Sequence, residues 1–472
     1  MNDGSSYRQL AGTLAREVEA LSPGARIPTH RELVRRFGAS ATTVADALAL
    51  LARQGLIESR PGSGSYRTEA RPTPRVGDTT WQEAVLEPVD AGPESARSFD
   101  VSGLLATLAT ASPDIVDLNG GYLHPDLQPA SMLGAALSRA ARRSAAWERP
   151  APGGLPELRD WFAAEIGGGL GRHDILVGGA GQGALATSLR ALAPPGAPIV
   201  VESPGYPGVT AAARAAGLRP VPVGLDGEGL RPEHLDDALT RTGARVVVVQ
   251  PHFQNPTGVS LSGSRGRELC DIARRHSAFV VEDDFARHLA HSDARPLPPA
   301  LIADDPDGVV VHIRSLTKAT SSSLRVGALA ARGPVMARLR AALIIDTMLV
   351  PAPLQYTALE VVTSPGWRRA LGTLAKALRH RRAVATEAVV ATFGADALAQ
   401  RPRGGYHLWV ALPAHPDGRQ FAAAALAHGV CVTPGENYYV SSHGGSPHIR
   451  ISYVAAPSPA DVDDAVRRLA RI

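Results

Sequence analysis

Residues 308–318 read GVVVHIRSLTK, an apolar run that leads into a polar turn and a lysine. The run Gly308–Ile313 is short and rich in β-branched residues, which is typical of a buried strand. Lys318 is one of only two lysines in the chain, and the other, Lys376, lies in an arginine-rich helical stretch at 374–382 where we expect it to be solvated. Chemistry that requires a lysine amine therefore points to Lys318.

Short apolar stretches alternate with longer helical ones around this strand. Further strands are predicted at Pro198–Glu202, Arg245–Gln250, Ala278–Glu282 and Val326–Ala331, and helices at Leu155–Glu165, Gly183–Leu192 and Ser264–His276. The alternation predicts an α/β fold, with a mostly parallel sheet covered by helices. Ligands of such sheets bind at the carboxyl ends of the strands, so the residues that follow each strand are candidates for a site.

The residues at these strand ends are the parts that a pyridoxal phosphate site needs. They provide an aromatic ring, an amide, a carboxylate, hydroxyls, a lysine, an arginine and a glycine-rich helix start: Tyr206, Asn255, Asp283, Ser315, Thr317, Lys318, Arg325 and the turn Gly181-Gln182. The amine forms an imine with the aldehyde, and the carboxylate pairs with the protonated pyridine nitrogen. Glycine amides, hydroxyls and the arginine hold the phosphate. A helix cap for Asp283 and a core position for Tyr206 remain as structural alternatives.

The first 68 residues are predicted to form three helices and a β-hairpin. The second helix opens with a capping box, Thr29 to Glu32, and Gly38 ends it in a left-handed turn. A tight turn between two short amphipathic helices is typical of a helix-turn-helix. The third helix presents Ser40, Thr42 and Thr43 at the end that normally enters the major groove.

Arginines surround this predicted DNA-contacting surface. Those placed to contact phosphates are Arg31, Arg35 and Arg53 on the helices and Arg60 and Arg67 on the hairpin wing. A three-helix protein-interaction module is the alternative, because residues 1–70 hold nine arginines against seven acidic residues and charge alone decides nothing.

Composition sets the broad class of the protein. A chain of 472 residues with 44% hydrophobic and 20% charged residues is expected to form two or three globular domains. Two cysteines exclude a disulfide scaffold and a cysteine-rich zinc module, and no metal site is predicted. No apolar run approaches the roughly 18 residues of a membrane span, and the N-terminus lacks the pattern of a signal peptide. We therefore expect a cytoplasmic protein with no membrane partner.

Periodicity is poor from residue 69 to residue 115, where prolines interrupt the pattern. We predict a linker over 69–115, with a short helix near Ser102–Leu108, between a DNA-binding domain at 1–68 and an effector domain at 116–472. Connections of this length are unusual inside one compact domain.

Two resemblances sharpen these predictions. Residues 23–33, the Ser40, Thr43 and Val44 helix start, and the wing at 55–64 resemble the winged helix of GntR-family bacterial regulators. Residues 116–472 resemble a fold-type I aminotransferase, in part through the stretch Trp147 to Arg159. The fusion of the two resembles the MocR subfamily of GntR regulators.

The resemblance implies a role for each candidate residue. Lys318 is the Schiff-base lysine, Asp283 the pyridinium partner, Asn255 a neighbour of the 3′-oxygen and Tyr206 the stacking ring. The phosphate is bound by Ser315, Thr317, Arg325 and the turn Gly181-Gln182. Arg450 matches the arginine that grips the carboxylate of an amino-acid ligand. The resemblance also implies a homodimer.

One residue departs from the family pattern. Phe285 follows Glu282-Asp283-Asp284 where a tyrosine is usual, so a hydrogen bond to the 3′-oxygen is missing. We predict that the cofactor binds but that turnover is weak or absent. The function predicted is a pyridoxal phosphate-dependent transcriptional regulator that binds operator DNA and senses an amine, an amino acid or the cofactor itself. The alternatives are a working aminotransferase with an accessory DNA-binding domain, and a DNA-binding protein whose large domain serves only for dimerisation.

Overall fold

The computed structural model describes residues 3–60, 63–68, 97–108, 112–441, 445 and 447–472. Contacts divide the chain into two compact units, Met1–Glu87 and Pro88–Ile472. Within the described ranges, no helix combines the length and the apolar character needed to span a membrane.

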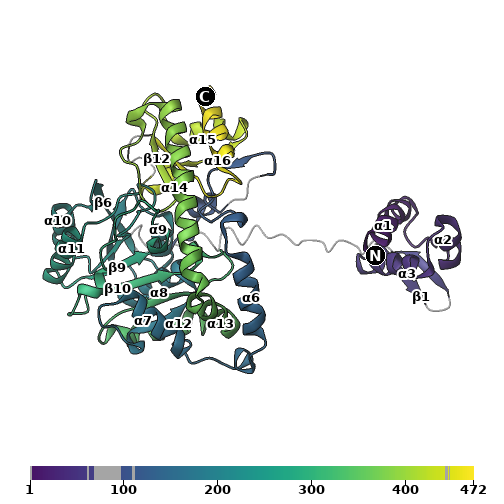
Figure 1. Ribbon diagram of the computed structural model, residues 1–472, viewed down its shortest axis with the longest axis horizontal. Coiled ribbons are helices and arrows are strands. Elements are labelled where there is room, and N and C mark those ends of the chain that lie inside the picture. The colour runs from purple at the N-terminus through teal and green to yellow at the C-terminus, as the bar shows by residue number, and fades with distance from the viewer. Residues whose placement is uncertain (1–2, 61–62, 69–96, 109–111, 442–444, 446) are drawn as a thin grey trace. The chain divides into compact units, whose positions relative to one another are not determined.

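The N-terminal unit is a small helical domain with a two-stranded wing (Figure 1). Its elements are α1 (Asp3–Ala20), α2 (His30–Phe37), α3 (Ala41–Arg53), β1 (Ile57–Arg60) and β2 (Gly64–Arg67). The predicted capping box is confirmed, since the Thr29 amide donates to Glu32 Oε2 at 2.7 Å. Gly38 takes the predicted left-handed conformation, with φ of 60°. The buried side chains of Leu14, Leu33, Val44 and Leu51 hold the three helices together.

The larger unit is built on an eight-stranded sheet, which confirms the predicted α/β fold. The strand order is β4-β11-β10-β9-β8-β5-β6-β7. Five neighbours, β6, β5, β8, β9 and β10, run parallel, whereas β11 and β7 are antiparallel to their neighbours. The bounds are β4 (Ile175–Gly178), β5 (Pro198–Ser203), β6 (Arg219–Asp226), β7 (Gly229–Leu230), β8 (Val246–Val249), β9 (Phe279–Asp284), β10 (Val310–Ser315) and β11 (Gly327–Ala330).

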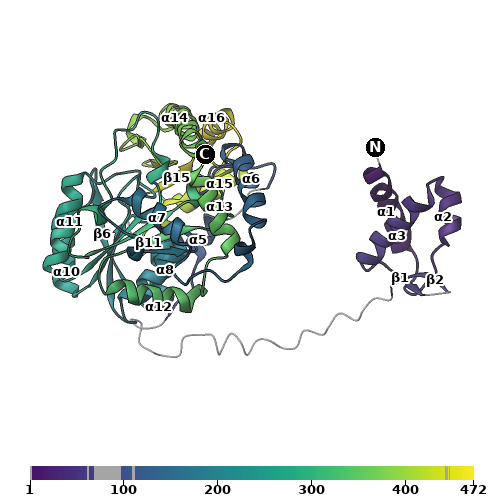
Figure 2. The same ribbon diagram turned by 60° about the horizontal axis from the view of Figure 1, so that its bottom comes forward.

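Helices cover both faces of this sheet (Figures 1 and 2). The four valines of β8 are all buried, as expected of a strand with helices on both sides. Val246 and Val248 pack with α8 (Ala180–Leu192), α9 (Pro207–Ala215) and α12 (Val335–Thr347). The opposite face packs with α7 (Pro156–Ile166), α10 (Pro232–Thr242), α11 (Gly263–Arg275), α13 (Ala352–Thr363) and α14 (Gly366–Phe393).

Strands β9 and β10 extend two residues beyond their predicted ends. The parallel ladder continues through the pairs Ile313 with Asp283 and Arg314 with Asp284, so the polar residues belong to the strands. Asp283 thus lies on a strand and is not the cap of a helix. This rigid position suits a residue that must hold a fixed geometry.

A second, three-stranded sheet lies in the C-terminal part of the chain. Its order is β12 (His407–Ala411), β15 (His448–Ser452) and β14 (Thr433–Pro434), all antiparallel. Helices α15 (Gly418–Ala427) and α16 (Pro459–Arg468) lie in the same part, with α16 against the long helix α14. A short parallel pair joins β13 (Val430–Cys431) to β3 (Val116–Asp117), and α6 (Ala130–Ala141) packs on α13.

Part of the predicted linker packs against the larger unit. Residues 69–96 and 109–111 lie outside the described residues, but the predicted short helix is present as α5 (Ser102–Ala106). The Ser98 amide donates to the Arg214 carbonyl at 3.2 Å, and Asn119 Nδ2 donates to the Ala106 carbonyl at 2.6 Å. Residues 98–106 therefore belong structurally with the unit that follows them.

Candidate functional site

The start of helix α3 is organised by its own hydroxyl groups. Ser40 is the N-cap, because its Oγ accepts a hydrogen bond from the Thr43 amide at 3.1 Å and lies 2.8 Å from Thr43 Oγ1. Thr42 is exposed and Thr43 is half-buried. Of the three predicted DNA-contacting hydroxyl residues, Ser40 and Thr43 shape the helix start and Thr42 presents its side chain to solvent.

The arginines of this unit differ in their surroundings. Arg31, Arg35 and Arg53 are exposed, as predicted for phosphate contacts. Arg60 pairs with Glu58 and lies 4.7 Å from the centre of the Tyr66 ring. Arg67 is half-buried and donates to the carbonyls of Glu19 and Leu21, where it caps the end of α1. The long sequence separation of that contact hides it from sequence reasoning.

In the larger unit, one cavity brings together all ten residues predicted for the cofactor and the ligand carboxylate. The ten are Gly181, Gln182, Tyr206, Asn255, Asp283, Ser315, Thr317, Lys318, Arg325 and Arg450. They come from the carboxyl ends of β5, β8, β9 and β10, the start of α8, the turn before β11, and β15. The cavity therefore lies where an open parallel sheet binds its ligands.

Lys318 follows β10 and points its amine at the 119–122 loop, which we define as Asn119, Gly120, Gly121 and Tyr122. Nζ donates to the Gly121 carbonyl at 2.7 Å and lies 3.9 Å from the centre of the Tyr122 ring. Burial, followed by the positive charge of Arg450, lowers the pKa of Lys318 to about 7. About half of the amine is therefore neutral, and so able to act as a nucleophile, near pH 7.

Asp283 faces the same cavity from β9. Burial is the main cause that raises the pKa of its carboxyl to about 6, although a hydrogen bond from Gln250 opposes this. Gln250 Nε2 donates to Oδ2 at 2.8 Å, while Oδ1 is buried without a hydrogen-bond partner among the described residues. An unpartnered carboxylate oxygen in a cavity is suited to a positively charged N–H donor.

Backbone geometry is strained in the part of the cavity where α8 begins. Ala180, at the start of α8, has φ of 67°, and Arg325 has φ of 49°, a region that residues other than glycine seldom adopt. Arg325 Nη2 donates to the Gly179 carbonyl at 3.2 Å, which ties the two strained residues together. Thr317 Oγ1 is buried with no hydrogen-bond partner in the described chain. A helix N-terminus, a hydroxyl and an arginine make this end suited to an anion.

Arg450 lies on β15 with its side chain almost fully buried. Nη1 lies 3.4 Å from Asn255 Oδ1, and Nη2 donates to the Asn119 carbonyl and to Thr433 Oγ1. Its Nε is buried without a partner among the described residues, and no carboxylate pairs with the guanidinium there. Arg450 therefore does not form the surface ion pair that is the usual role of an arginine. A buried guanidinium without an anion favours a carboxylate ligand.

Several cavity residues escaped sequence reasoning. They are Thr107, Leu108, Gly121, Tyr122, Gln250, Tyr406 and His407. Tyr406 donates to the Gly121 carbonyl at 2.6 Å, the same atom that Lys318 contacts. The Asn119-Gly120-Gly121 sequence is typical of a turn after an apolar stretch. It is the one feature of the sequence that indicates part of this set of cavity residues.

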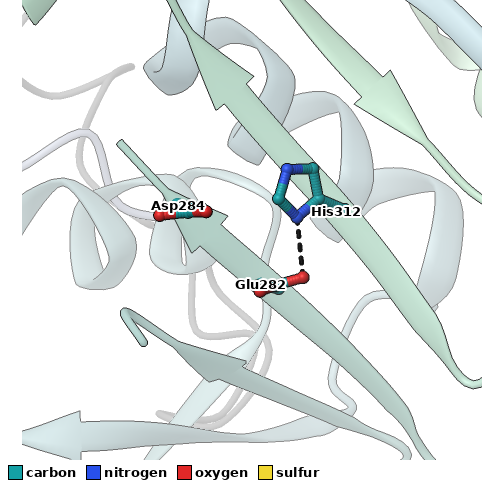
Figure 3. Close-up of side chains that lie close together, drawn as sticks. All are labelled: Glu282, Asp284 and His312. Carbon is teal, nitrogen blue, oxygen red and sulfur yellow. Dashed lines mark hydrogen bonds and ion pairs between the residues drawn. The ribbon is translucent and has the colours of Figure 1, made fainter. Parts of the chain in front are cut away.

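Behind Asp283, the other face of β9 carries a buried ionic network (Figure 3). Glu282 accepts a hydrogen bond from the Leu301 amide at 2.8 Å and lies 2.6 Å from His312 Nδ1. Asp284 accepts from Arg287 at 2.7 Å and from Arg314 at 3.1 Å. Burial opposes ionisation of Asp284, but Arg314 and its neighbours lower the pKa of this carboxyl.

The Glu282, Asp284 and His312 ligand atoms lie within 4.8 Å of one another, a spacing that a metal ion can bridge. Two guanidinium groups already pair with Asp284, and they repel a further cation. The Glu282 carboxylate is also engaged, because it accepts from the Leu301 amide and lies beside His312 Nδ1. We therefore interpret the cluster as a structural network that fixes the strand carrying Asp283.

Comparison with known proteins agrees with this geometry. Residues 114–469 match the family model of class I and II aminotransferases, and this match spans most of the chain. The chain belongs to the aminotransferase class I and II family. Residues 6–66 match the gntR family of bacterial regulatory proteins. The predicted combination of the two domains, that of the MocR subfamily, is confirmed.

Two transcriptional regulators match this chain over nearly their whole length. The chain is 27% identical to the uncharacterized HTH-type transcriptional regulator YdcR of Escherichia coli, over 92% of each chain. It is 26% identical to the HTH-type transcriptional regulator TauR of Rhodobacter capsulatus, over 95% of this chain and 92% of TauR. This class I and II aminotransferase family member is therefore a DNA-binding transcription regulator, as predicted, and this function is supported over the alternative of a working aminotransferase with an accessory DNA-binding domain.

A solved structure resembles the larger unit. The α-aminoadipate aminotransferase LysN of Thermus thermophilus, complexed with N-(5′-phosphopyridoxyl)-L-leucine, superposes with a TM-score of 0.73 at 26% identity. The match covers 83% of this chain and 97% of LysN.

The lowered pKa of Lys318 predicts how the reactivity of its amine changes with pH. In pulses of acetic anhydride, acetylation of Lys318 should reach half its plateau near pH 7 and fall about tenfold per pH unit below it, because only the neutral amine reacts. Mass spectrometry of the peptide that contains residue 318 measures this profile. In Asp283→Asn the midpoint should move to lower pH, because the Asp283 charge favours the protonated amine. A midpoint above pH 9 in the unaltered protein would contradict the prediction.

Proposed function

We propose that the effector domain binds pyridoxal 5′-phosphate at Lys318 and that an amine, an amino acid or the cofactor itself controls the affinity of the DNA-binding domain for operator DNA. One observation carries the proposal. A nucleophilic lysine, an unpartnered carboxylate oxygen and an anion-binding end converge on one cavity in a chain that also holds a winged helix.

The chemistry of the cavity fits this cofactor. When bound, the cofactor supplies an aldehyde that condenses with a primary amine. Lys318 provides that amine, and Asp283 Oδ1 is free to hold a proton at the pyridine nitrogen. Ser315, Thr317, Arg325 and the Gly181-Gln182 turn line the end suited to the phosphate. Tyr206 provides a ring for stacking, and Asn255 an amide for the 3′-oxygen.

An amino acid is a suitable signal because Arg450 offers an uncompensated guanidinium in the same cavity. LysN, of similar fold, is complexed with a phosphopyridoxyl adduct of leucine, which unites a cofactor and an amino acid in one ligand. In this chain, the incoming amine would take the place of the Lys318 amine on the cofactor, and Arg450 would bind the ligand carboxylate. Differential binding of this kind shifts a second equilibrium by about 1–3 kcal/mol.

Exposed apolar side chains on the larger unit support a homodimer. Trp147 is 73% exposed, and Ile345 and Met348 are 84% and 69% exposed. Large apolar side chains at such positions are typical of a surface that another subunit covers. We therefore propose a cytoplasmic homodimer, with a DNA-binding domain at 1–68, a connection at 69–115 whose last part packs on the effector domain, and an effector domain at 116–472.

The cofactor proposal predicts a visible absorption band that depends on one residue. Protein purified with pyridoxal phosphate should absorb in the visible range, and Lys318→Ala should lose the band, because Lys318 is the only lysine among the described residues that line the cavity. Lys376→Ala is the matched control and should keep it, because Lys376 does not line the cavity. A band of unchanged intensity in Lys318→Ala would overturn the proposal. No band in the unaltered protein would also overturn it, and would favour a domain that serves only for dimerisation.

The second prediction concerns turnover. Phe285 lines the cavity and cannot hydrogen-bond the 3′-oxygen, so conversion to the pyridoxamine form should be weak or absent in single-turnover spectroscopy with candidate amino acids. Phe285→Tyr should raise the rate by about tenfold, which corresponds to one hydrogen bond to a charged oxygen. Efficient conversion by the unaltered protein would favour the working aminotransferase instead.

The third prediction concerns DNA. We propose that Arg31, Arg35, Arg53 and Arg60 contact phosphates and that Thr42 faces the bases. Arg31→Ala should weaken binding to specific and non-specific DNA alike and reduce the slope of log affinity against log salt by about 1. Fluorescence anisotropy with a fragment of the gene's own promoter measures the slope. Arg16→Ala removes an exposed arginine of α1 outside this surface and should leave the slope unchanged. Equal slopes for the unaltered protein and Arg31→Ala would remove Arg31 from the DNA interface.

A further inference from the structure

The 119–122 loop contacts both side chains that would handle an amino-acid ligand. The Asn119 carbonyl accepts a hydrogen bond from Arg450 Nη2, and the Gly121 carbonyl accepts one from Lys318 Nζ at 2.7 Å. Between them, the Gly120 carbonyl accepts from Ser452 Oγ at 2.6 Å. Three successive carbonyls are thus held by side chains, and two of these, Lys318 and Arg450, line the cavity. A change at Lys318 or Arg450 therefore acts directly on this loop.

The side chain of Asn119 connects the same loop to helix α5. Asn119 is 1% exposed, and its Nδ2 donates to the Ala106 carbonyl at 2.6 Å. Its Oδ1 accepts from Thr433 Oγ1, which also accepts from Arg450 Nη2 at 3.2 Å. Ala106 is the last residue of α5, where helix carbonyls lack partners within the helix. A single buried amide therefore joins the arginine to the end of this helix.

Helix α5 has few other attachments. It is five residues long and buries none of them, and Leu105 is 59% exposed. Segments with few buried contacts open locally at low cost in free energy. Thr107 and Leu108, which follow α5, line the cavity itself. Towards the N-terminus, the chain from α5 leads to the DNA-binding domain. The Asn119 hydrogen bond is thus placed to control the segment that joins the two domains.

We infer that Asn119 is a positioning residue that transmits occupancy of Arg450 by a carboxylate to helix α5. The inference rests on the proposed function, since it requires a carboxylate ligand in the cavity. A carboxylate that binds the guanidinium competes with the Asn119 carbonyl and with Thr433 for Nη2. The Asn119 carbonyl is then released from the guanidinium, and Asn119 Nδ2 withdraws from Ala106. The ligand-free protein holds α5 in place, and the carboxylate-bound protein loosens it.

Two probes isolate the role of the carboxylate. N-(5′-phosphopyridoxyl)glycine carries the cofactor and a carboxylate, and N-(5′-phosphopyridoxyl)methylamine lacks only the carboxylate. Amide hydrogen exchange of the full-length protein, measured by mass spectrometry over residues 102–108, reports how often α5 opens. We expect the glycine adduct to speed exchange there by about three- to tenfold, the effect of losing one buried hydrogen bond. The methylamine adduct should leave the exchange rate unchanged.

Variants test the path through Asn119. In Asn119→Ala, exchange over 102–108 should be fast without a ligand, and the glycine adduct should add nothing although it still binds. Thr433→Val removes the hydroxyl that donates to Asn119 Oδ1, and exchange over 102–108 in the ligand-free variant should lie between that of the unaltered protein and that of Asn119→Ala. This variant provides the test if Asn119→Ala does not fold. Leu105→Ala, at an exposed position of the same helix, should keep the full difference between the two adducts.

The outcomes separate this inference from the proposed function. Calorimetry that finds no binding of either adduct would overturn both. Binding of both adducts with identical exchange over 102–108 would overturn the coupling through Asn119 and leave the cofactor site intact. A full glycine-dependent difference that persists in Asn119→Ala would likewise overturn the role of Asn119.

Discussion

A half-buried lysine amine that forms no ion pair with an acidic residue in the described part of the chain constrains the rest of the cavity. Removal from water disfavours the charged form of Lys318, and Arg450 and Arg325 add to this effect, while Asp283 opposes it. The amine still needs a hydrogen-bond acceptor, and the Gly121 carbonyl supplies one. The 119–122 loop must therefore lie against the end of β10, which draws the C-terminal sheet and α5 to the same place through Ser452 and Asn119.

The register of β9 against β10 decides which acidic residue faces the lysine. Successive side chains of a strand point to opposite faces, so Asp283 shares a face with Ser315, and Glu282 and Asp284 share the other with His312 and Arg314. A slip of one residue would exchange the two sets. It would also leave two carboxylates without their partners in a buried environment, at a cost of several kcal/mol. The network in Figure 3 thus stabilises the register on which the cavity depends.

Sequence reasoning was most successful where local patterns carry the information. The strands that end at the cavity were predicted because β-branched runs and the polar residues after them are contiguous, and the capping box at Thr29 needs only four residues. The 119–122 loop, Tyr406 and His407 were missed because they reach the cavity through contacts that span nearly 200 residues or more. Arg67 shows the same limit, since its contacts with Glu19 and Leu21 depend on how α1 meets the wing. The predicted ends of β9 and β10 lie two residues too early, because charged residues in a sequence suggest the end of a strand. In the structure these charged residues remain in the strands, because their ion-pair partners are buried together with them.

A regulator and an enzyme need different things from the same cavity. An enzyme must stabilise a transition state more than its ligand, whereas a sensor only has to bind its ligand more tightly in one conformation than in another. Conversion would destroy the signal and limit the time for which the bound state persists. On the proposed function, the chain retains the groups that would hold a ligand, which are a half-buried lysine, a buried carboxylate and a buried guanidinium, while Phe285 lies beside them where the resemblance implies a tyrosine. On this function, the absence of the tyrosine hydroxyl separates binding from turnover. The binding energy then remains available to move the segment that leads to the DNA-binding domain.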